Sequence, residues 1–365
     1  MARHQAWLEH WTLEVRCWMS DVWVLWFWVS PRRMPAPSIN PVLPPLTFRP
    51  IFKERVWGGR TLETLYGKPL PPGIPIGESW EITDRSGDVS VIAEGPLAGK
   101  DLRWVMERHS RDLLGDVKPE NGRFPLLVKI LDAREKLSLQ VHPPPDKASA
   151  LGGEPKTELW YITQAAPGAE LYVGLKRGVT RPEFEAEIRT GRVAECFHRV
   201  PVRAGDAMFL PSGRVHAIGA GLVLFEIQQN SDTTYRVFDW NRVGLDGKPR
   251  ELHIAQSIES IDFTDSEPSL VDTTASSAGR FKIRPLVRHA LFKVDLFRAL
   301  AKESLIFRQP RLRIVAALEN RVRVSDDTHP VELSPGRFCL IPASVKAAEI
   351  GCEIGSSFLL VEPGR

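Results

Sequence analysis

The 365-residue sequence is organised around LSLQVHP at residues 137–143, which KTELWYI follows at residues 156–162. Apolar and polar residues alternate in the first stretch, so Ser138, Gln140 and His142 share one face of a predicted strand. The second stretch predicts another strand, which begins at the carboxylate of Glu158. Because both strands lie in the apolar middle of the chain, we expect an amide, an imidazole and a carboxylate to line an internal cavity.

Composition and charge limit the classes of protein to which this chain can belong. Hydrophobic residues make up 43% and charged residues 25%, as in a globular protein, and the net charge of +3 is too small to indicate nucleic-acid binding. None of the four cysteines forms a CxxC pair, which argues against a disulfide framework or a thiolate zinc site and fits a reducing cytoplasm. The 30 prolines and 27 glycines indicate many turns. We therefore expect a cytoplasmic, mainly β protein with a few short helices.

The N-terminal residues 1–45 do not conform to the rest of the chain. Their apolar run, VWVLWFWV at residues 22–29, is much shorter than the roughly 20 residues that a transmembrane helix needs. It has the length of a signal-peptide core, although Glu9, Glu14 and Asp21 stand where basic residues belong. The alternative is an extension ahead of a true start at Met34. We expect a disordered extension and no membrane association.

A second motif is GDAMFLPSGRVH at residues 205–216. Gly205 permits a hairpin turn, and Pro211 with Gly213 forces a tight turn before a strand on which His216 faces inward. Further strands are predicted over residues 77–82, 124–131, 171–174 and 222–227, and helices over residues 61–66, 101–114 and 181–191. The stretch VWGGR at residues 56–60 predicts a turn.

Four polar residues of these motifs form a candidate metal site, namely Gln140, His142, Glu158 and His216. Imidazole and carboxylate ligands suit zinc, and other divalent metals are compatible with them. A single histidine in such a strand is usually a packed core residue. Two histidines and a glutamate, together with the Gly-Pro-Gly-His spacing, indicate a metal site instead.

The spacing of residues 205–216 resembles the second signature of cupin β-barrels. Gln140-x-His142 followed by Glu158 resembles their first signature, with one histidine replaced. Together with VWGG at residues 56–59 and GESW at residues 77–80, these motifs resemble the short bacterial type I mannose-6-phosphate isomerases over about residues 46–262. The resemblance implies one Zn²⁺ per chain, bound by the four residues of the candidate metal site. It also implies the interconversion of mannose 6-phosphate and fructose 6-phosphate through a cis-enediol.

The resemblance implies catalytic roles for Lys156 and Arg236. Lys156 precedes Glu158 by two residues, and it is either the base that shuttles the proton or a phosphate contact. Arg236 follows His216 by twenty residues. It either stabilises the developing oxyanion or holds the phosphate through its planar guanidinium, with Asp232 orienting it.

Three further residues match positions around the phosphate pocket of the family, namely Ser138, Lys129 and Lys136, and we expect Asp232 to contact the substrate as well. The pattern alone leaves Lys129 as either an edge lysine or a lysine that points into a polar cavity. Lys136 is equally compatible with a surface position at the start of the strand.

The C-terminal part of the chain contains an internal repeat. The stretch SPGRFCLIPAS at residues 334–344 repeats the Gly-to-Pro interval of residues 205–211, but Ala347 stands at the position of His216. We therefore expect a catalytic cupin domain at residues 46–263 and a C-terminal cupin domain at residues 280–365 that lacks metal ligands. The polar segment 264–279 is the predicted linker.

Two other functions stay open. Two histidines and one carboxylate also form the iron site of cupin dioxygenases. Gln140, Lys156 and Arg236 argue against this function, since they suit an anionic sugar. A non-catalytic, sugar-binding protein with two cupin barrels is the other alternative. For the isomerase we expect a phosphosugar substrate, no nucleic acid or membrane partner, and a monomer or weak homodimer.

Overall fold

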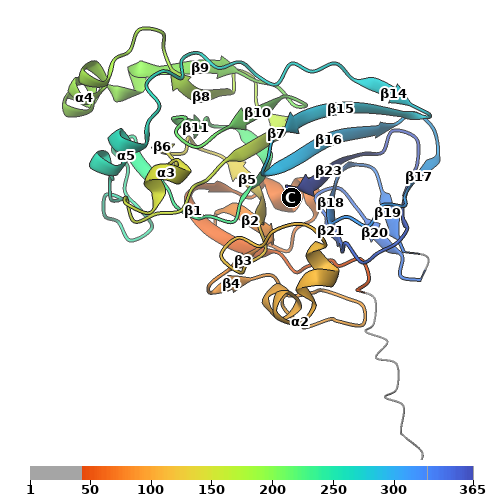
Figure 1. The fold of residues 1–365 in the computed structure, drawn as a ribbon. Helices are drawn as coiled ribbons and strands as arrows, with labels where there is room; N and C mark the ends of the chain where they lie inside the picture. The colour runs from red at the N-terminus through yellow and green to blue at the C-terminus, as the bar shows by residue number, and fades with distance from the viewer. Residues whose placement is uncertain (1–42, 327, 365) are drawn as a thin grey trace, which may run out of the picture. The chain divides into compact units, whose positions relative to one another are not determined.

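The computed structural model describes residues 43–326 and 328–364, and these residues form antiparallel sheets joined by loops and a few short helices (Figure 1). The expectation of a mainly β protein is thus confirmed. Nearly all of the predicted N-terminal extension lies outside the described residues. Its last part does not, and Leu43 is already buried in the hydrophobic core.

The first half of the described chain forms two sheets. The strands of the six-stranded sheet are, in spatial order, β1 (Ile51–Gly59), β2 (Ile76–Ile82), β5 (Leu126–Ala133), β12 (Leu222–Gln229), β7 (Glu158–Ala165) and β10 (Ala207–Leu210). Those of the five-stranded sheet are β13 (Tyr235–Phe238), β6 (Leu139–Val141), β11 (His216–Ile218), β8 (Glu170–Leu175) and β9 (Phe197–Pro201). The strands predicted around the two motifs are present, although β6 is only three residues long.

The second half repeats this arrangement. Its six-stranded sheet has the order β14 (Ser276–Ala278), β15 (Phe281–Arg288), β16 (Phe292–Ala299), β23 (Ser357–Pro363), β18 (Arg313–Glu319) and β21 (Phe338–Ile341). Its four-stranded sheet has the order β17 (Glu303–Phe307), β22 (Ala348–Cys352), β19 (Val322–Ser325) and β20 (Val331–Leu333). The two halves share a hydrophobic core, and the backbones of Leu46 and Leu340 exchange two hydrogen bonds of 2.8 Å.

The predicted helices are present and have clear end signals. They are α1 (Thr61–Tyr66), α2 (Leu102–Leu114) and α4 (Arg181–Thr190). The fold also contains the short elements β3 (Asp84–Arg85), β4 (Asp88–Val89), α3 (Pro145–Ala148), η1 (Val193–Cys196) and α5 (Ile254–Ser260). Asp101 caps α2 by accepting a hydrogen bond from the Trp104 amide, and Thr180 forms a capping box with Glu183 at the start of α4. Within residues 43–364, no described helix has the length and apolarity needed to cross a bilayer.

The turn predicted at residues 56–60 is wrong. Strand β1 continues to Gly59, and it pairs with β2. A Cβ atom added to Gly58 would overlap the backbone of Gly77 on β2. The glycine is therefore needed for the close approach of two strands rather than for a turn.

Candidate active site

A row of polar residues crosses the six-stranded sheet of the first half. In the strand register, Glu226 on β12 lies between Lys129 on β5 and Trp160 on β7, and Trp80 on β2 lies beyond Lys129. Directly opposed residues project from the same face of a sheet. The Trp160 indole meets the His216 ring of the other sheet edge to face, with 5.4 Å between the ring centroids. This polar face therefore points into the space between the two sheets.

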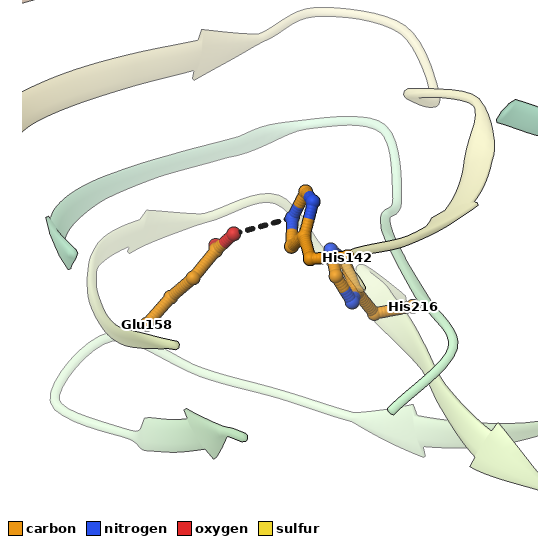
Figure 2. Close-up of side chains that lie close together, drawn as sticks. All are labelled: His142, Glu158 and His216. Atoms are coloured by element: carbon orange, nitrogen blue, oxygen red, sulfur yellow. Dashed lines mark ion pairs between the residues drawn. The ribbon is translucent and has the colours of Figure 1, made fainter. Parts of the chain in front are cut away.

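His142, Glu158 and His216 converge in this space (Figure 2). All three are buried, and one ligand atom from each lies within 4.8 Å of the other two. Nε2 of His142 lies 2.6 Å from Oε1 of Glu158. Over residues 43–326 and 328–364, this is the one group of three or more such side chains close enough to share a metal ion.

Backbone carbonyls orient both imidazoles. Nδ1 of His142 donates to the Thr233 carbonyl at 2.7 Å, and Nδ1 of His216 donates to the Arg214 carbonyl at 2.9 Å. Burial and then the neighbouring Lys156 ammonium lower the pKa of His142 to about 3, and burial also lowers the pKa of His216. Both rings are therefore neutral, and each carries on Nε2 the lone pair that a metal would bind, facing Glu158 in one ring and Gln140 in the other.

Gln140 lies beside this group, opposite His216 in the register of β6 and β11. Its Nε2 lies 3.2 Å from Nε2 of His216. A half-turn of the amide exchanges its nitrogen and oxygen without moving the rest of the side chain. With Oε1 in that place, two imidazoles, a carboxylate and an amide oxygen could serve as ligands of one divalent cation.

Lys156 is buried against the same carboxylate. Its Nζ lies 2.6 Å from Oε1 of Glu158, 3.4 Å from Nε2 of His142 and 3.9 Å from Oε1 of Glu226. Burial acts to lower the pKa of Lys156, but the charges of Glu158 and Glu226 outweigh it and raise the pKa. In this ion-paired arrangement Lys156 is an ammonium ion.

Glu226 is a site residue that the sequence analysis missed. Only 3% of it is exposed, and burial followed by the charge of Glu158 raises its pKa to about 7. The Trp160 indole donates to both carboxylates, at 2.8 Å to Glu226 and 3.0 Å to Glu158. The available signal was a carboxylate within the otherwise apolar LVLFEI run at residues 222–227.

Lys129 and Lys136 occupy different environments. Lys129 is buried on a central strand, with Nζ 3.3 Å from Glu226 and 3.6 Å from Glu78. It therefore points into the polar interior and is not a lysine at the edge of the sheet. Glu78 in turn accepts a hydrogen bond of 2.7 Å from Nε of Arg55. Lys136 lies over the Trp240 ring, with 4.2 Å between Nζ and the ring centroid.

A cleft of about 570 Å³ opens beside the buried group. Its lining includes Ser138, Gln140, Asp232 and Arg236, together with residues 54–57 of β1 and residues 244–246 of the loop after β13. The cleft thus brings together four of the predicted site residues, from β6, β13 and the segments that precede these two strands.

Arg236, Arg242 and Arg250 lie at or beside this cleft, and two of them share one carboxylate partner. Arg236 donates from Nη1 to the Glu251 carbonyl at 2.6 Å rather than to Asp232, and its buried Nε has no partner among the described residues. Asp239 accepts hydrogen bonds from Arg242 and Arg250. Burial and then Arg250 lower the pKa of Arg236, although a guanidinium remains charged. The lining of the cleft itself carries three arginines and three carboxylates, and Arg236 is the group on this side that suits an anion.

Comparisons with known proteins agree with this geometry. The family described as "Phosphomannose isomerase type I, catalytic domain" matches residues 46–159. The mannose-6-phosphate isomerase ManA of Bacillus subtilis is 37% identical over 300 residues, which cover 82% of this chain and 93% of ManA. The mannose-6-phosphate isomerase of Streptococcus mutans is 34% identical over 306 residues, which cover 83% of this chain and 94% of that protein.

Similarity in structure also extends over most of the chain. The crystal structure of a mannose 6-phosphate isomerase from Bacillus subtilis superposes with a TM-score of 0.80 at 30% identity, covering 88% of this chain and 100% of that one. Sequence relatedness over most of both chains, a shared fold and a matching catalytic-domain segment all point to one family. The chain belongs to the type I phosphomannose isomerases.

Proposed function

We propose that this protein is a metal-dependent aldose–ketose isomerase that interconverts mannose 6-phosphate and fructose 6-phosphate through a cis-enediol. The observation that carries the proposal is the buried group of two neutral histidines, Glu158 and Lys156 beside a cleft that Arg236 lines. The reaction requires a metal site, a proton-transfer group and an anion-binding surface in one place.

The metal ligands in this proposal are Gln140, His142, Glu158 and His216, with Zn²⁺ as the expected ion. A bound divalent cation supplies Lewis acidity that polarises the carbonyl and the neighbouring hydroxyl of the sugar. Because only one of the four ligands is charged, the site keeps a net positive charge that stabilises an anionic enediolate.

Proton transfer between the two sugar carbons is assigned to Lys156, with Glu226 as its partner. While Glu158 is paired with Lys156, its charge raises the pKa of the Lys156 ammonium. When Glu158 acts as a metal ligand, its charge no longer favours the ammonium, and the pKa of Lys156 falls toward the working pH. Oε1 of Glu226 lies 3.9 Å from Nζ of Lys156, close enough to exchange a proton with it through a small movement.

The phosphosugar is held by residues that line the cleft. Arg236 binds the phosphate or the developing oxyanion through its guanidinium, and Ser138 and Asp232 contact the substrate. Lys129 and Lys136 are already engaged, one between two carboxylates and the other on an aromatic ring. We therefore assign to these two lysines a contribution to the electrostatic potential of the cleft.

The architecture proposed for this activity is a catalytic cupin barrel at residues 46–263, a linker at residues 264–279 and a second barrel at residues 280–365 without metal ligands. The end of the linker forms β14, the edge strand of the second six-stranded sheet. The repeated pair of sheets supports two barrels. The apolar cluster between the sheets of the second half supports the absence of a metal site there.

The test is a coupled assay of mannose 6-phosphate conversion to fructose 6-phosphate with enzyme stripped by a chelator and then supplied with Zn²⁺. We expect activity to vanish on stripping and to return with the metal. Absence of turnover in metal-loaded protein contradicts the proposal, and oxygen uptake with iron would identify a dioxygenase instead.

A further inference from the structure

Gln228 is a fully buried amide next to the proposed metal site, and none of the assigned roles uses it. It lies on β12 opposite Glu158 on β7, and it shares a face with Glu226 two residues earlier. Its Nε2 donates to the carbonyls of Gln229 at 2.8 Å and Ser231 at 2.6 Å. Its Oε1 has no partner among the described residues.

These two carbonyls belong to a strap, residues 229–234, that leads from β12 to β13. The Ser231 hydroxyl accepts from the Thr233 amide at 3.3 Å and donates to the Glu154 carbonyl at 3.3 Å. The Thr233 hydroxyl accepts from the Glu154 amide at 2.9 Å. The Thr233 carbonyl accepts the hydrogen bond from Nδ1 of His142. A continuous path of hydrogen bonds and short backbone links therefore runs from Gln228 through the strap to His142.

We propose that Gln228 is a positioning residue for the metal site, which it serves by fixing the strap that orients His142. This inference rests on the proposed function only in taking His142 as a metal ligand. The partner of the second imidazole nitrogen controls the orientation of a ligand histidine and hence metal affinity. A primary amide can donate one N–H to each of two adjacent carbonyls, whereas methionine has the same length and no donor.

The sharpest test compares two neighbouring substitutions on β12 in the full chain. Gln228→Met removes both donors, whereas Ile227→Ala truncates a buried core residue on the opposite face of the strand. Co²⁺ affinity is measured by competition with a chromophoric chelator, and the visible spectrum of the bound Co²⁺ reports ligand geometry. We expect Gln228→Met to weaken Co²⁺ binding about 10- to 100-fold and to change the spectrum. Ile227→Ala should lower the unfolding midpoint while leaving both readouts unchanged.

A Gln228→Met protein that binds Co²⁺ like wild type, or no more weakly than Ile227→Ala, overturns the proposal. If Gln228→Met does not fold, Ser231→Ala breaks the next link of the strap by removing one atom. It should weaken Co²⁺ binding several-fold, and unchanged binding also overturns the proposal. None of these measurements requires turnover, so the isomerase assay on wild-type enzyme can fail independently of them.

Discussion

The two halves of the chain share a strand order but differ in what their sheets enclose. In each six-stranded sheet the last strand in sequence, β12 or β23, is inserted between two earlier strands. The first half encloses Lys129, Glu158 and Glu226 between its sheets. The second half encloses an apolar cluster that includes Val315, Phe358 and the side chains packed around them.

This difference shows that one strand arrangement can enclose either an ion-paired polar interior or an apolar one. Burying a charge is costly unless an opposite charge is close, so the first half tolerates its polar interior only because the lysines and glutamates alternate. The second half needs no such pairing, since its interior is stabilised by apolar burial. The first half should therefore be sensitive to the loss of one charge, and the second to a change of volume.

The largest expected effect is the loss of a metal ligand in the first half. His216→Ala removes one imidazole from the buried group, and activity should fall by more than the roughly 10- to 100-fold that loss of a ligand's hydrogen-bond partner costs. Metal content by mass spectrometry should fall with it. The matched control is His329→Ala, at an exposed position of the second half. Equal metal content in both variants would remove His216 from the ligand set.

The next effect concerns chemistry rather than metal binding. Lys156→Met removes the proposed proton-transfer group, and kcat should fall by about 10²- to 10⁴-fold, the contribution typical of general acid–base catalysis. Because the amine is proposed to act on the reacting carbons rather than on the phosphate, KM should change much less. Steady-state kinetics on Zn²⁺-loaded enzyme separates the two parameters. A large rise in KM with unchanged kcat would make Lys156 a phosphate contact.

A smaller effect compares the cost of removing a buried charge in the first half with the cost of removing apolar volume in the second. Lys129→Met leaves Glu78 and Glu226 without the cation that lies between them, which should cost about 3–5 kcal/mol in the free energy of unfolding. Ile350→Val in the apolar cluster of the second half removes one buried methyl group and should cost about 1 kcal/mol. Urea denaturation measures both. Similar costs for the two variants would show that the polar interior is no more sensitive than the apolar one.

Sequence reasoning succeeded where a local pattern determines the structure. The alternation in residues 137–143 predicted β6, and the Gly205 to His216 spacing predicted β10, the turn after it and β11. The helices predicted over residues 101–114 and 181–191 are present as α2 and α4, and Asp101 and Thr180 cap them. In each case, neighbours in sequence supply the atoms that fix the backbone.

Sequence reasoning failed where distant strands decide the outcome. Gly58 was assigned to a turn because its need for space comes from Gly77 on another strand. Glu226 was missed because its partners, Lys129 and Trp160, are brought beside it only by the sheet register. The sequence also left open whether Lys129 points outward or inward, because its neighbours Glu226 and Glu78 lie on other strands.

The smallest expected effect is a pH dependence of stability at Glu78, the outer end of the buried charge row. Burial acts to raise the pKa of Glu78, but Lys129 and Arg55 outweigh it and lower the pKa to about 2 from its usual 4.5. A lowered pKa in the folded state stabilises the protein above pH 4.5, and this contribution is lost as the pH falls toward 2. By pH 3, about 2 kcal/mol should be lost in wild type and not in Glu78→Gln. Urea denaturation from pH 6 to pH 3 measures the difference, with the exposed Glu332→Gln of the second half as control. A Glu78→Gln protein with the pH profile of wild type would show that the charges beside Glu78 do not stabilise its ionised form.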